Sequence, residues 1–213
     1  NILEMVCKAG GGVFRCVHPI WKSIIDDKYH NSNVTYMSNY VVNTSTAQWA
    51  KETECPVRYI RVHAASSGNI EVLEWTHDMW YTTEDHEDYS NDVCSLAASG
   101  GHLNALQWAR KHKYIWDVET CTAAAKGGHI EVLKWARENK CDWNKSTSEA
   151  AMLGGHLELL KWAIDNGCPK KSGQMCIYAA LSGNLECLKY ARNMRWRWDQ
   201  FVSCVAALKG HLN

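Results

Sequence analysis

The sequence predicts an all-α solenoid of stacked helix-turn-helix repeats. A Gly followed by a short apolar segment recurs six times, with spacings of 33, 27, 27, 28 and 27 residues. An Ala stands four positions before every one of these glycines. An aromatic residue stands seven positions after each complete one, at Trp75, Trp108, Trp135, Trp162 and Tyr190. Such a period is typical of repeat architectures, in which stacking of neighbouring units closes the core.

Each unit is expected to form two short helices. After Gly128, apolar residues stand at offsets 2, 4, 5, 7 and 8 and polar residues at offsets 3, 6 and 9. This pattern predicts a second helix with a wide apolar face and a narrow polar stripe. The small residues before the Gly predict a first helix whose backbone approaches its neighbours closely, with Asp117, Asn144 and Asp199 as its N-caps. The Gly supplies the backbone freedom for the turn between the two helices.

The repeat array is expected over residues 40–213, as about six units of which the last is truncated. A degraded unit around Trp49 precedes that of Trp75, and only three residues follow the last repeat glycine, Gly210. We expect the first helix of the last unit to expose apolar residues, because a capping repeat normally covers them. Residues 1–39 lack the period and are interpreted as an N-terminal helical cap.

The composition excludes several classes of function. The 213 residues carry 23 basic and 23 acidic side chains, so the formal net charge is zero. This balance argues against a concentrated positive surface for nucleic acid and against a polybasic membrane patch. The apolar runs are too short to span a bilayer, and no secretory leader is recognised after Asn1. We therefore expect neither nucleic acid nor a membrane as a partner.

The segment 120–139 (TCTAAAKGGHIEVLKWAREN) resembles the ankyrin repeat. The positions that match that family's pattern are Ala124, Ala125, Gly128, His129, Glu131, Val132 and Leu133. The units are most similar to short, Trp-marked ankyrin-like repeats of protist, algal and giant-virus arrays. They are 27 residues long in most cases, against about 33 in the standard repeat, so its hairpin finger is expected to shrink to a turn. The resemblance implies a non-catalytic scaffold for protein–protein interaction.

A second resemblance precedes the array. Residues 13–26 (VFRCVHPIWKSIID) are similar to the C-terminal half of an F-box, although the leading Leu-Pro half is missing and Pro19 interrupts the expected helix. This resemblance implies an alternative function, a substrate receptor of a Cullin–RING ubiquitin ligase with a Skp-type adaptor as partner. The residues expected to bind the adaptor are Phe14, Val17, Trp21 and Ile24.

The recurring cysteines and histidines are interpreted as parts of the repeat. Ser148 and Ser203 replace Cys at one of its repeat positions, which a metal site or a disulfide would not tolerate. Asn replaces the His after the turn Gly in two units, although Asn cannot act as an acid or base. With no C-x-x-C pair, phosphate loop or nucleophile motif, we expect no metal, no cofactor and no catalytic residue. Ten unpaired cysteines favour a reducing compartment: the cytoplasm, the nucleus, or the host cytoplasm for a viral protein.

The candidate partner-binding residues are those that vary between units on a constant frame. They are Tyr81, Lys113, Tyr114, Lys170, Arg195, Trp196 and Arg197; the recurring loop residues Trp116 and Trp143 are further candidates. An acidic insert, Thr82–Asp92, lengthens one period to 33 residues and suits a basic partner surface. Its candidate residues are Glu84, Asp85, Glu87 and Asp88. Trp116 and Trp143 recur at one position, so packing between units remains an alternative for them. We expect an unidentified protein partner and a monomeric chain.

Overall fold

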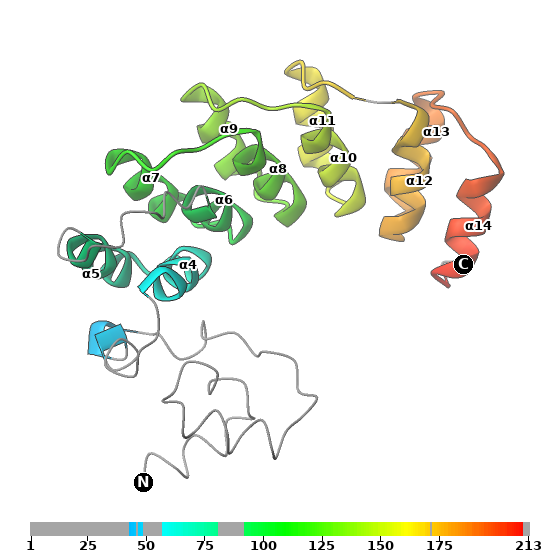
Figure 1. Ribbon diagram of the computed structural model, residues 1–213. Helices are drawn as coiled ribbons and strands as arrows, with labels where there is room; N and C mark the ends of the chain where they lie inside the picture. Colours follow the sequence, from blue (N-terminus) through cyan, green and yellow to red (C-terminus); the bar gives the residue numbers. More distant parts are fainter. Residues whose placement is uncertain (1–42, 46, 49–56, 81–91, 171, 211–213) are drawn as a thin grey trace, which may run out of the picture. The chain divides into compact units, whose positions relative to one another are not determined.

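The computed structural model describes residues 43–45, 47–48, 57–80, 92–170 and 172–210. The secondary structure of these residues is helical and contains no strand (Figure 1). The expected fold class, an all-α solenoid of stacked helix-turn-helix repeats, is confirmed. The described residues form two compact units. One contains those up to Val93 together with 104–114, and the other contains 94–103 and those from Ile115 onward.

In the first compact unit, α4 (Val57–Ser67) and α5 (Ile70–Trp80) pack against each other across the turn at Gly68. The contact buries Ile60 and Leu73 completely. Most of α7 (Leu103–Lys111) belongs to the same unit.

The second compact unit is a row of helix pairs (Figure 1). The first helices contact one another in chain order and are α8 (Val118–Gly127), α10 (Lys145–Leu153), α12 (Ser172–Ser182) and α14 (Gln200–Leu208). The second helices each pack on the first helix of their pair and are α9 (Ile130–Glu138), α11 (Leu157–Asp165) and α13 (Leu185–Asn193). Most of α6 (Asp92–Ser99), from Cys94 onward, also belongs to this unit.

Small residues bring the first helices together, as expected. Ala124, Ala151 and Ala179 are buried in α8, α10 and α12. The predicted N-caps are confirmed, because Asp117, Asn144 and Asp199 each accept a hydrogen bond from the backbone N–H two residues further on. These caps satisfy backbone donors that the first turn of a helix leaves without an intrahelical acceptor.

The turn between paired helices needs Gly for two separate reasons. Gly128 has φ 78°, a left-handed conformation that L side chains rarely adopt. The His156 ring of the following unit also lies against it, so a Cβ on Gly128 would be only 2.5 Å from His156 Nδ1. His156 Nε2 lies 3.1 Å from the Lys126 carbonyl oxygen. The His side chain therefore ties its own turn to the end of the preceding first helix.

Asn184 shows why Asn can replace His at this position. Its Nδ2 donates to the Gly155 carbonyl at 2.9 Å, and its Oδ1 accepts from Glu186 N and Cys187 N. His129 and His156, by contrast, make no side-chain cap on their own helices. At this repeat position His and Asn therefore both connect neighbouring units. Asn184 in addition caps the second helix of its own unit.

The cysteines of the described residues are free thiols, and six of the seven are buried. Cys121 and Cys176 point from the first helices to the loops, with Sγ 3.9 Å from the Cys141 carbonyl oxygen and 3.7 Å from that of Trp196. At the same repeat position Ser148 donates to the Pro169 carbonyl at 2.7 Å. The slot therefore holds a small hydrogen-bond donor that joins helix and loop, which explains the exchange of Cys and Ser.

The last described helix, α14, is the least covered of the first helices. Val202 is its buried residue, while Phe201 is 59% and Leu208 is 85% exposed. The expected boundary between residues 39 and 40 and the adaptor-binding candidates Phe14, Val17, Trp21 and Ile24 lie outside the described residues.

Candidate functional site

The loops after the second helices repeat one backbone conformation and one pattern of exposure. Their first residue has a left-handed backbone: Lys113 (φ 64°), Lys140 (66°), Gly167 (84°) and Arg195 (53°). The next residue is buried: Tyr114, Cys141, Cys168 and Trp196. The third is exposed: Ile115, Asp142, Pro169 and Arg197. Each loop therefore presents a different side chain to solvent at an equivalent place.

Backbone hydrogen bonds hold this loop conformation. The N–H of the buried loop residue donates to an Ala carbonyl in the preceding second helix. The pairs are Tyr114 to Ala109 (3.0 Å), Cys141 to Ala136 (2.9 Å), Cys168 to Ala163 (2.9 Å) and Trp196 to Ala191 (3.2 Å). Because these bonds involve the main chain, the exposed third position can change between units without altering the frame.

Two candidate partner-binding residues are corrected by their burial. Tyr114 and Trp196 are each only 7% exposed. The Tyr114 hydroxyl lies 3.3 Å from His77 Nδ1, and the Trp196 ring packs edge-on against Tyr190 with centroids 5.7 Å apart. Both fill the slot that Cys occupies in other units, six residues after the repeat aromatic. This shared position is the sequence signal that could have predicted their burial, whereas the variability of the residue type led to the opposite expectation.

The remaining candidates fall into three groups. Lys113, Lys170, Arg195 and Arg197 are exposed. Trp116 and Trp143 are half-buried and pack edge-on against Trp135 and Trp162, with ring centroids 5.7 and 5.9 Å apart. Tyr81, Glu84, Asp85, Glu87 and Asp88 lie outside the described residues.

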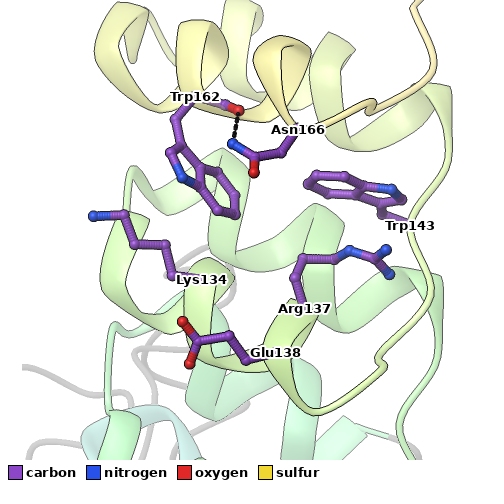
Figure 2. A pocket seen from close by; sticks show the side chains of 6 residues that line it. All are labelled: Lys134, Arg137, Glu138, Trp143, Trp162 and Asn166. Atoms are coloured by element: carbon purple, nitrogen blue, oxygen red, sulfur yellow. Dashed lines mark hydrogen bonds between the residues drawn. The ribbon is translucent and has the colours of Figure 1, made fainter.

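A pocket of about 370 Å³ lies between α9 and α11 (Figure 2). Its lining residues are Lys134, Arg137, Glu138, Trp143, Trp162 and Asn166. Figure 2 shows Trp162 and Asn166 reaching down from α11, Lys134 and Arg137 rising from α9, and Trp143 closing one side from the loop. Of these residues only Trp143 was a candidate from the sequence. Trp162 belongs to the predicted apolar face of its helix, and its half-buried ring contributes to the pocket wall.

The Arg137 guanidinium is held in place by two contacts. It donates to the Cys141 carbonyl oxygen and lies over the Trp143 ring, with its central carbon 4.3 Å from the ring centroid. No carboxylate of the described residues forms an ion pair with it. Lys134, on the other side of the pocket, pairs with Glu131 at 2.9 Å. The pocket thus combines two indole rings with a guanidinium that has no anionic partner among the residues that the structure describes.

The combination does not recur in the next unit. Ile164, Lys170 and Tyr190 stand at the positions equivalent to Arg137, Trp143 and Trp162. There the Lys161 ammonium lies 5.9 Å from the centroid of the Tyr190 ring. The pocket side chains therefore differ from their equivalents in the next unit, whereas the preceding unit carries the same residue types at these positions, Arg110, Trp116 and Trp135.

The comparisons with known proteins agree with this architecture. Residues 148–192 match the family model described as ankyrin repeats (many copies), a segment that extends from α10 into α13. Repeats of this family are protein–protein interaction modules and are typically non-enzymatic. A comparison with curated proteins gave no match.

Two further properties concern the residues that the structure describes. None of their helices is long and apolar enough to cross a membrane. Nor do they contain a group of three or more His, Cys, Asp or Glu side chains that could hold a metal ion.

Proposed function

We propose that this chain is a non-catalytic protein–protein interaction scaffold. The loops after the second helices, together with the pocket between α9 and α11, form the surface that contacts the partner. The observation that carries this proposal is the constant loop frame, on which the exposed third position changes from unit to unit.

The exposed position carries four different chemistries. It is apolar in Ile115, acidic in Asp142, a rigid pyrrolidine ring in Pro169 and basic in Arg197. None of these side chains is buried, so packing of the core does not select among them. A row of fixed positions with unit-specific chemistry is how a repeat protein distinguishes one partner surface from another.

The proposal is tested by affinity capture with the full chain and two matched variants. The loop variant carries Asp142→Asn, Pro169→Ser and Arg197→Gln. The control variant carries Lys126→Gln and Leu153→Gln, which are exposed at the ends of first helices. Proteins that are recovered with the wild type and the control but lost with the loop variant are then tested by direct titration. Equal recovery with all three chains contradicts the proposal.

The F-box resemblance supports the alternative function, a substrate receptor of a Cullin–RING ubiquitin ligase. Under this alternative the repeats select the target, and Trp21 and Ile24 contact a Skp-type adaptor. Co-purification of such an adaptor with the full chain, and its loss in the Trp21→Ala, Ile24→Ala double variant, would support this role. We also propose a reducing compartment such as the cytoplasm for the chain, because its described cysteines form no disulfide.

A further inference from the structure

We propose that the pocket between α9 and α11 is the anchor point of the interface, and that it binds an aromatic side chain adjacent to a carboxylate. The occupant is therefore an acidic peptide segment of the partner that carries a Phe, Tyr or Trp next to Asp or Glu. This inference rests on the proposed scaffold function and specifies the chemistry of its partner.

Arg137 provides the site for the carboxylate. A guanidinium has five N–H donors, and its planar fork matches the two oxygens of a carboxylate. In this structure the group donates to the Cys141 carbonyl and is held against Trp143. Because its position is already fixed, binding a carboxylate costs less side-chain entropy than ordering a free surface Arg.

The two indole rings provide the aromatic part of the site. Trp143 and Trp162 meet edge-on, with an interplanar angle of 65° and centroids 5.9 Å apart. Both rings line the pocket and both remain half-buried, so each retains surface that a partner ring can cover. Partly enclosed Trp residues of this kind are the most frequent hot spots of protein interfaces.

The charges at the pocket favour an anion over a cation. Of the charged lining residues, Lys134 is already paired with Glu131, so Arg137 is the cation of the pocket that makes no ion pair within the described residues. Arg137 already occupies a face of Trp143, the position that a cationic side chain would seek in a cation–π contact. Glu138 is exposed and makes no ion pair within the described residues, so its charge weakens the attraction for a carboxylate, which the N–H donors of Arg137 provide.

The test uses three synthetic peptides that differ at one residue: acetyl-Gly-Phe-Glu-Gly-amide, its Gln analogue and its Lys analogue. Each is titrated into the full ¹⁵N-labelled chain while the indole N–H signals of Trp143 and Trp162 are followed. We expect the Phe-Glu peptide to shift both signals with a Kd of about 1 mM, and the Gln analogue to bind roughly tenfold more weakly. The Lys analogue should leave both signals unchanged.

Variants taken from the repeat itself keep the fold intact. Arg137→Ile introduces the residue that stands at the equivalent position of the next unit, Ile164, and should weaken Phe-Glu binding about tenfold. Glu138→Gln should strengthen it about threefold, because it removes the opposing charge. Arg192→Ile is the matched control: Arg192 lies over Trp198 in the same way, at 4.7 Å, but outside the pocket, and its loss should leave Phe-Glu binding unchanged.

The inference is overturned if the Lys peptide binds as well as the Glu peptide, if Arg137→Ile leaves binding unaffected, or if the shifts occur only at other Trp signals. Its failure differs from that of the scaffold proposal. If the natural partner is lost by the loop variant but kept by Arg137→Ile, the scaffold function stands and the anchor does not. If neither variant affects the partner, both are wrong.

Discussion

Replacing Gly128 with Ala separates the two reasons for which the structure needs a glycine at the helix turn. The first is the backbone, since φ is 78° and a left-handed conformation costs a non-Gly residue about 1 kcal/mol. The second is space, since the new Cβ would stand 2.5 Å from Nδ1 and 2.6 Å from Cε1 of His156. Overpacking of this kind costs roughly 1–3 kcal/mol. We therefore expect Gly128→Ala to lower the free energy of unfolding by about 2–4 kcal/mol in total.

Gly167 is the matched control for the backbone contribution. Its φ is 84°, and a Cβ built on it meets no atom within 4 Å. Lys140 stands at the same loop position of the preceding unit with φ 66°, which shows that the frame accepts a side chain there. Gly167→Ala should therefore cost only about 1 kcal/mol.

A second substitution isolates the steric contribution. Asn184 occupies the place of His156 in the next unit, and there the corresponding Cβ on Gly155 would lie 3.3 Å from the nearest Asn184 atom. In a chain that carries His156→Asn, Gly128→Ala should consequently lower the free energy of unfolding by about 1 kcal/mol, close to the effect expected for Gly167→Ala. The difference between the two backgrounds measures the contact with the imidazole.

The assay is urea unfolding of the full chain, followed by far-UV circular dichroism and by Trp fluorescence. Coincidence of the two signals shows whether a single free energy of unfolding applies, which repeat proteins do not guarantee. If Gly128→Ala costs no more than Gly167→Ala, or if His156→Asn does not relieve it, the packing of His156 on the turn is not what requires the glycine.

Three further predictions concern the thiols, a helix cap and the acidic insert. Burial raises the pKa of Cys168 to about 11, so an alkylating reagent at pH 8 should modify the exposed Cys204 long before Cys168. Titration in denaturant should count close to ten thiols, and native mass spectrometry that finds stoichiometric zinc would contradict this interpretation. Asn144→Ala removes the cap of α10 and should cost about 1 kcal/mol by urea unfolding, whereas the exposed neighbouring change Asp142→Ala should cost close to nothing. Deleting residues 82–87 restores a 27-residue period, so the melting temperature should barely change. The deletion should weaken partner binding more at low salt than at high salt, and an unchanged affinity at every salt concentration would remove the insert from the interface.

The sequence by itself determined the repeat period, the helix pairs and their caps. These features are local: an apolar spacing that matches one helix face, an Asp or Asn before a first turn, and a Gly where φ is positive. The exchange of Cys with Ser at one position also indicated a structural slot, and the hydrogen bonds of Cys121 and Ser148 to loop carbonyls give that slot its physical basis. The same local logic predicted the caps at Asp117 and Asn144.

Only the tertiary structure decided which loop residues face solvent and where the pocket lies. Tyr114 and Trp196 are variable residues on loops, yet they are buried, because exposure follows the position of a residue in the frame and not its type. The pocket depends on Trp162, whose Cα belongs to the unit after that of Arg137 and Trp143. A periodic pattern within one unit does not predict which side chains of two neighbouring units come into contact. These contacts depend on the packing distance between the units and on the rotamers that the side chains adopt when the units stack.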